Sequence, residues 1–163
     1  MGEEPDAEDT GEKGYNYRSE RFANRLKHNS NISKIFNSRI HGDPATPVFR
    51  VYSGERVIFR TVMPADKPRN VGFCIHGHRL RKQPIDPLAK QTSLQGGISI
   101  GNTFNLELDN ESSSPGDYLY RSGSFKWDVE SGIWGILRIL KKGCLCKCRN
   151  FYHFCQCKLC NKP

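Results

Sequence analysis

The chain of 163 residues lacks any long apolar run: no stretch approaches the roughly 20 consecutive apolar residues that a transmembrane helix requires. The first 30 residues are acidic and polar, so they do not have the basic and apolar regions of a secretory signal peptide. We therefore expect no membrane span. The cytoplasm is the default location, unless the chain is part of something larger.

Acidic residues are missing after Glu130, although lysine and arginine continue to the C-terminus. Residues 1–14 show the opposite bias, because Lys13 is their only basic residue. The formal net charge of +8 is therefore unevenly distributed, with an acidic N-terminus and a basic C-terminus. Such asymmetry can indicate a tail that binds a polyanion, but a soluble basic tail is the favoured interpretation. No nucleic-acid recognition motif is present, so nucleic acid is not an expected partner.

The composition divides the chain into four parts. We expect a disordered acidic N-terminus, a linker or arm, one folded domain and a basic cysteine-rich tail, at residues 1–14, 15–43, 44–140 and 141–163 respectively. Within the arm, Ser19 could cap a short helix that places Phe22 and Leu26 on one face. An irregular arm lying across the domain explains the same residues, and both interpretations stay open.

From Asp43 onward the apolar residues repeat with a period of two, which is typical of strands. The clearest alternation places Phe104, Leu106 and Leu108 on one side. We predict strands at residues 48–52, 56–63, 71–76, 98–100, 104–109, 118–122 and 133–140, and a basic, proline-bearing loop at 79–93. Short strands separated by turn signals indicate an all-β fold, an antiparallel β-sandwich.

Three segments in this order resemble the C-terminal cupredoxin domain of multicopper oxidases: Phe73–His78, Gly116–Tyr120 and Gly132–Gly135. Two upstream segments, Gly14–Glu20 and Met63–Asn70, are most similar to the large bacterial members, including the manganese-oxidase-like ones. The resemblance implies a cupredoxin-like Greek-key sandwich, copper as cofactor, and oxidation of a metal ion or phenol coupled to dioxygen reduction in the intact enzyme.

The residues at the ligand positions depart from that family. A type 1 copper needs a cysteine thiolate, two histidines and often an axial methionine. The resemblance places Val71, Ser122, Asp128 and Ile133 at these positions. We therefore expect no blue copper site and no autonomous oxidase activity.

Of the family's trinuclear copper ligands, His76 clearly remains, with Cys74 as a substitute. Arg121 and Gly123 stand where the histidines flanking the copper cysteine would be. On a continuous strand, Cys74, His76 and His78 would form one row on the same face, a candidate site for copper or zinc with a fourth ligand from elsewhere. The alternative is a remnant of the scaffold, with the histidines hydrogen-bonded in a loop.

A second candidate metal site lies in the tail, which the resemblance does not cover. Its cysteines, flanked by basic residues, are Cys144, Cys146, Cys148, Cys155, Cys157 and Cys160. Thiolates at such spacing can collect Cu(I) or zinc. A disordered segment with free thiols and a frame-shifted end of a larger gene explain the same composition.

Two functions follow. The chain is either a terminal cupredoxin domain, with other cupredoxin domains of a larger oxidase or further copies of itself as partners, or a non-enzymatic metal-binding module that uses the tail.

Overall fold

The computed structural model describes residues 18–63, 71–109 and 114–142. The predictions for the acidic N-terminus and for the tail cysteines concern residues outside these ranges.

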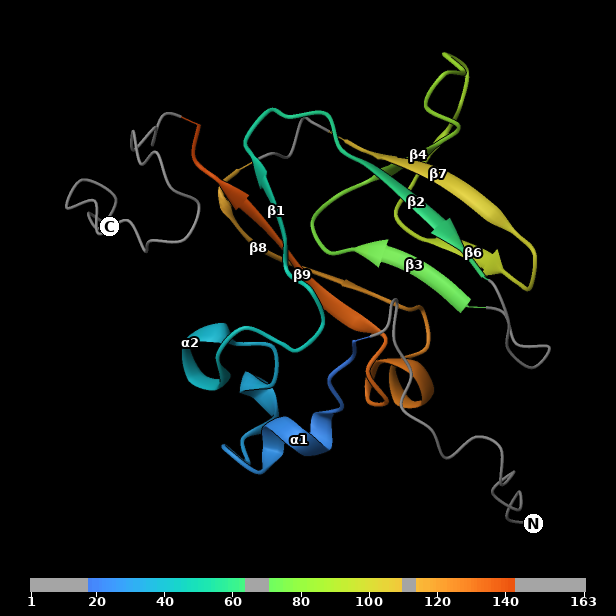
Figure 1. The fold of residues 1–163 in the computed structure, drawn as a ribbon. Coiled ribbons are helices and arrows are strands. Elements are labelled where there is room, and N and C mark those ends of the chain that lie inside the picture. Colours follow the sequence, from blue (N-terminus) through green and yellow to red (C-terminus); the bar gives the residue numbers. More distant parts are fainter. Residues whose placement is uncertain (1–17, 64–70, 110–113, 143–163) are drawn as a thin grey trace, which may run out of the picture.

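Two β-sheets form the body of the protein (Figure 1). The five-stranded sheet has the order β1-β9-β8-β3-β6, and its strands are Phe49–Tyr52, Trp134–Leu140, Gly116–Arg121, Val71–Ile75 and Gln95–Ile98. The four-stranded sheet has the order β2-β7-β4-β5, with strands Ile58–Val62, Thr103–Leu108, Leu80–Lys82 and Gln91–Thr92. Strand β1 runs parallel to β9, and the other pairs are antiparallel. The predicted all-β sandwich is confirmed.

The prediction of a loop at residues 79–93 is wrong, because β4 and β5 lie within it. In β4 only Leu80 is buried, while Arg81 pairs with Glu107 of β7 in the ladder. One apolar residue among basic ones leaves no alternation to read. Strand β6 also begins at Gln95, earlier than the predicted start at Ile98.

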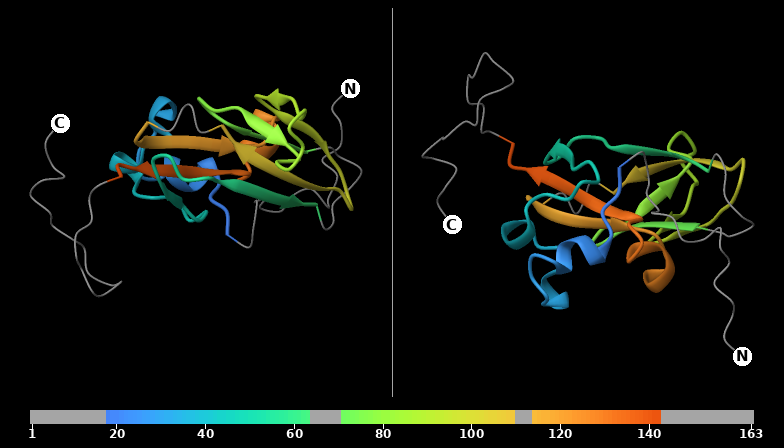
Figure 2. Two further views of the ribbon diagram at one scale, coloured as in Figure 1. Left: turned by 90° about the horizontal axis from the view of Figure 1, so that it is seen from above. Right: turned by 60° about the horizontal axis from the view of Figure 1, so that its bottom comes forward.

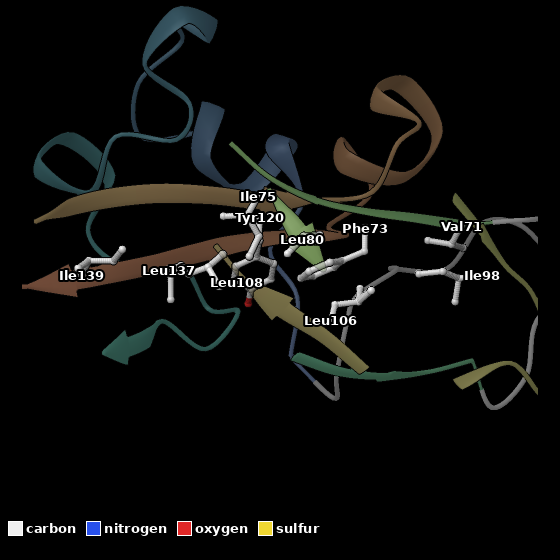
Figure 3. Packing of buried hydrophobic residues seen from close by; sticks show 10 residues of the cluster. All are labelled: Val71, Phe73, Ile75, Leu80, Ile98, Leu106, Leu108, Tyr120, Leu137 and Ile139. Carbon is white, nitrogen blue, oxygen red and sulfur yellow. The ribbon is translucent and has the colours of Figure 1, made fainter. Parts of the chain in front are cut away.

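The main core lies between the two sheets (Figure 3). Its buried members come from both sheets and are Val71, Phe73, Ile75, Leu80, Ile98, Leu106, Leu108, Tyr120, Leu137 and Ile139. The predicted alternation in β7 is confirmed, since Leu106 and Leu108 are buried and Phe104 packs against the same cluster.

Helical segments cover the other face of the β8 and β9 region, away from the second sheet (Figures 2 and 3). They are the α-helices α1 (Phe22–Leu26) and α2 (Ser38–His41), the 3-10 turn η2 (Ile32–Lys34) and the π-helical turn η4 (Phe125–Val129). The short helix is therefore the interpretation that holds for the arm, although its N-cap is Arg21 and not Ser19. None of the described helices is long and apolar enough to cross a bilayer.

A second apolar cluster joins this arm to the sheet. Phe22 and Ile35 of the arm are buried against Trp134 and Ile136 of β9. The Trp134 indole donates a hydrogen bond to the carbonyl oxygen of Glu20 at 2.8 Å. The arm is thus packed into the domain through buried aromatic contacts.

Candidate functional site

A cavity of about 340 Å³ lies where β3 ends, and we call it the β3-end cavity. It is lined by the end of β3 and the following turn, by Ser93 and Leu94 before β6, and by Arg121 and Gly123 at the end of β8. Cys74, His76 and His78 all line it, so the structure brings the three predicted residues to one place.

These three residues do not form the predicted row on one strand, and that part of the prediction is wrong. Strand β3 ends at Ile75, and Gly77 has a φ of 75°, which turns the chain. The His78 amide then donates back to the carbonyl oxygen of Ile75 at 3.2 Å. The turn leaves His76 exposed and buries His78.

The His76 ring is engaged by Arg121. Nε of Arg121 donates a hydrogen bond to Nε2 of His76 at 2.8 Å. An imidazole nitrogen that accepts carries no proton, so this bond fixes His76 as the neutral tautomer protonated at Nδ1. Burial, and then the charge of Arg121, lower the pKa of His76 below its ordinary value. The nitrogen facing Arg121 is therefore not available to a metal while this bond exists.

His78 is the most buried polar group of the cavity, with 5% of its surface exposed. Its ring lies edge-on to Tyr118 at 4.4 Å between centroids. Among the described residues, neither ring nitrogen has a hydrogen-bond partner of ordinary geometry. Burial lowers the pKa of His78, although the backbone and charge of Asp109 oppose this. The backbone of Asp109 is therefore the polar group that engages this buried ring.

The Cys74 thiol donates to the carbonyl oxygen of Arg121, with 3.6 Å between sulfur and oxygen. Burial raises the pKa of this thiol, against the smaller opposing effect of Arg121. Cys74 is therefore a protonated thiol near neutral pH, and a thiol binds metals far less well than a thiolate.

The positions that the resemblance assigns to the type 1 copper ligands are filled in another way. The Ser122 hydroxyl, fully buried, donates a hydrogen bond to the buried carboxylate of Asp128. Val71 and Ile133 are each only 8% exposed. The Ile133 amide donates a hydrogen bond to the carbonyl oxygen of Asp128 at 2.9 Å. This bond joins the residue before β9 to the turn η4.

These residues do not fit a type 1 copper. A hydroxyl, a carboxylate and two aliphatic side chains supply neither the thiolate nor the imidazoles that hold such a copper. Within the described ranges, no group of three or more His, Cys, Asp or Glu side chains is placed to hold a metal ion. We therefore derive no chemistry through copper at these positions.

Sequence reasoning did not assign Ser93 and Leu94 to the site, and nothing in their local pattern could have done so, since they reach it from an irregular segment. It placed Arg121 at a lost histidine position but did not predict its bond to His76. The sequence signal for a changed site was the positive charge of Arg121, because an arginine in place of a copper ligand changes which ions the site favours.

No family model matches this chain, and no curated protein matches it. Solved structures do. A multicopper oxidase structure shares 18% identity, covering 59% of this chain and 35% of that protein, with a TM-score of 0.50. A laccase from Botrytis aclada gives 17% identity, 61% and 19% coverage and a TM-score of 0.47. The blue copper oxidase from Nitrosomonas europaea gives 16% identity, 59% and 31% coverage and a TM-score of 0.46.

At this identity the likeness to the first of these structures shows the fold and nothing more. The sandwich is cupredoxin-like, and it resembles a domain of multicopper oxidases. The chain spans about a third of the length of that oxidase.

Proposed function

We propose that this chain is a multicopper-oxidase-like cupredoxin domain whose type 1 copper position has been lost, and that it serves as a structural or interdomain partner without oxidase activity of its own. The observation that carries this proposal is the buried hydrogen bond between Ser122 and Asp128, because it satisfies two polar groups where the family needs metal ligands. The segments Gly14–Glu20 and Met63–Asn70 favour the large bacterial members as its relatives.

Copper loading tests this proposal. The full chain is incubated with Cu²⁺, desalted and submitted to elemental analysis, and its visible spectrum is recorded. A second sample that ends at Lys142 separates copper held by the tail from copper held by the sandwich. We expect no intense blue absorption in either sample, and a blue band that survives the truncation would overturn the proposal.

The partners in this proposal are other cupredoxin domains of a larger oxidase, or further copies of this chain. The support is the size of the match, since a single sandwich covers only 35% of the multicopper oxidase it resembles. Light scattering after gel filtration distinguishes a self-assembling chain from one that needs a different partner.

The second candidate is a non-enzymatic module in which the tail cysteines bind Cu(I) or zinc. It is supported by the clustering of Cys144, Cys146, Cys148, Cys155, Cys157 and Cys160. Truncation after Lys142 should then abolish uptake of Cu(I) and zinc. Unchanged uptake would exclude the tail as the site.

A further inference from the structure

We propose that the loop between β4 and β5 docks this domain onto an anionic lipid membrane, with Ile85 and Leu88 entering the boundary between headgroups and acyl chains. We call residues 83–90 the β4–β5 loop. This role goes beyond the one proposed for the domain and does not depend on it. Three features of the loop support it: its exposed apolar tip, its ordered backbone and the cations at its base.

The tip of the loop is apolar and almost fully exposed. Ile85 is 95% and Leu88 is 87% exposed, and no other large apolar side chain in the described ranges exceeds 62%. Figure 1 shows the yellow-green loop extending away from both sheets. Single exposed aliphatic residues are common on protein surfaces. Two of them at the tip of one protruding loop can leave water only by entering something outside the domain.

The backbone of the β4–β5 loop is ordered by its own contacts. Gln83 has a φ of 58°, which turns the chain out of β4. The Asp86 amide donates to the carbonyl oxygen of Gln83 at 3.0 Å, and the Asp86 carboxylate accepts from the Leu88 amide at 2.8 Å. Pro84 and Pro87 have a φ fixed by their rings. The loop therefore presents its apolar side chains with little conformational entropy left to lose on docking.

The base of the loop is basic. Residues 79–93 contain four cations and one carboxylate, which are Arg79, Arg81, Lys82, Lys90 and Asp86. Arg81 lies opposite Glu107 of β7 in the ladder. Lys82 and Lys90 are exposed at the two ends of the loop, and Nζ of Lys82 lies 4.7 Å from the centre of the Phe104 ring. Two lysines therefore flank the apolar tip, while the one carboxylate is already engaged by the loop backbone.

An apolar tip flanked by lysines fits the surface of an anionic membrane. Aliphatic groups gain by entering the boundary between headgroups and acyl chains, and basic groups near the surface are attracted by anionic headgroups. The two contributions act together here, because the lysines lie at the base of the loop and the apolar groups lie at its tip.

A protein partner fits the same loop less well. Two copies that met through their tips would bring the cations of both loops together, which costs free energy through like-charge repulsion. A stable protein interface also buries roughly 800 Å² on each partner. Two aliphatic side chains on a narrow loop supply only a small part of such an area, whereas a membrane accepts a narrow tip.

The test is sedimentation of the full chain with phosphatidylcholine vesicles, with and without phosphatidylserine, at physiological salt and under reducing conditions. We expect binding to the vesicles that contain phosphatidylserine. Ile85→Ser combined with Leu88→Ser should weaken this binding by at least about tenfold, because it removes the apolar groups and no charge. The matched control is Ile32→Ser combined with Val62→Ser, which changes two exposed aliphatic residues elsewhere and should leave the binding unchanged.

A basic tail attracts anionic vesicles by charge alone, so a second readout must report on the loop itself. Leu88→Trp adds an indole at the tip, and vesicles with brominated acyl chains should quench its fluorescence. Ile32→Trp is the control and should show no quenching beyond that of the wild-type chain.

The cations of the loop are tested by a separate pair of changes. Lys82→Gln combined with Lys90→Gln should weaken the binding to phosphatidylserine and make it less sensitive to salt. Lys27→Gln combined with Lys34→Gln removes two exposed lysines from the helical arm and serves as the control.

Several results would overturn the membrane assignment. The first is the absence of vesicle binding by the wild-type chain, which needs no variant to fold. Full binding by the chain with serine at positions 85 and 88, or no quenching of the added indole, would assign the attraction to another basic region. Equal binding with and without phosphatidylserine would contradict the role of the lysines. Self-association in light scattering that the two serine changes abolish would make the loop a contact between copies.

Discussion

At the scale of single residues, Ser122 and Asp128 lie where the resemblance places two of the copper ligands. Both side chains are buried, and the hydroxyl donates to the carboxylate. Replacing Ser122 by alanine removes the donor and leaves a buried carboxylate poorly satisfied. We expect Ser122→Ala to lower the free energy of unfolding by about 2 kcal/mol, measured by urea denaturation.

Ser114, which is exposed, provides the matched control, and Ser114→Ala should leave the stability within about 0.5 kcal/mol. The double variant Ser122→Ala with Asp128→Ala should lose less stability than the two single variants predict by addition, because the second change removes the unpaired acceptor. Strict additivity would mean that the two residues are not coupled and that the hydrogen bond contributes little.

The two histidines of the β3-end cavity give a pH dependence with a definite sign. Burial lowers the pKa values of His76 and His78 below the ordinary 6.5. As the pH falls, the unfolded chain therefore binds protons before the folded one does, so stability is full above about pH 6.5 and is lost below it. Protonation of His76 also removes the acceptor for Arg121.

We expect the urea midpoint to fall between about pH 7.5 and about pH 5.5, and this fall should be smaller in the double variant His76→Asn with His78→Asn. His28→Asn changes an exposed histidine and serves as the control. If the urea midpoints of the double variant and the wild type change in parallel with pH, these two histidines are not the source of the pH dependence of stability.

At the scale of elements, the contact between β8 and β9 leaves no room for a side chain at Gly135. A Cβ at that position would overlap the ring and the hydroxyl of Tyr120, whose hydroxyl donates to the carbonyl oxygen of Pro47 at 3.0 Å. Tyr120 is 1% exposed and has no free space to move into. Gly135→Ala should therefore cost about 2 kcal/mol or more through overpacking.

The control is Gly96→Ala in β6, since nothing lies within 4 Å of the position that its Cβ would occupy. Thermal unfolding of both variants measures the difference. Equal melting temperatures would show that β8 can shift away from β9, and that the tyrosine does not fix their spacing.

The helical arm is the second element whose packing can be tested. Phe22 is 4% exposed, with its ring edge-on to those of Phe36 and Trp134. Removing a buried ring costs about 3 kcal/mol or more, so Phe22→Ala should destabilise the whole sandwich. Ile32→Ala, at a residue 60% exposed in the same arm, should have little effect. A normal melting temperature for Phe22→Ala would mean that the arm detaches without consequence for the domain.

The strands that sequence predicted correctly are those with an apolar face. Strand β7 alternates cleanly, and its predicted range of 104–109 lies one residue from the observed Thr103–Leu108. Strand β4 was missed because it has one buried residue, and β5 because it has two residues in all. The cavity was predicted only in part for a related reason: the bond from Arg121 to His76 joins residues 45 positions apart, and no local pattern encodes it.

At the scale of the whole molecule, a cupredoxin-like fold does not by itself supply copper chemistry. An oxidase of this class needs a copper that takes electrons from the substrate, and that copper needs a thiolate for its electron-transfer character. The resemblance places Ser122 at that position, and Ser122 is bonded to Asp128, while the guanidinium of Arg121 engages His76, which the resemblance assigns to a copper ligand. The two apolar clusters hold the sandwich together through side chains that are not metal ligands, so the fold does not require copper ligands at these positions.

The full chain supplied with Cu²⁺ should therefore oxidise a phenolic dye no faster than the same concentration of copper in buffer. The comparison is made by following the dye absorbance over a series of chain concentrations, because protein-dependent turnover rises with the chain and background oxidation does not. The chain that ends at Lys142 controls for redox reactions of the tail thiols. Turnover that rises with chain concentration and survives this truncation would mean that the sandwich itself holds a functional copper, in spite of the residues at its ligand positions.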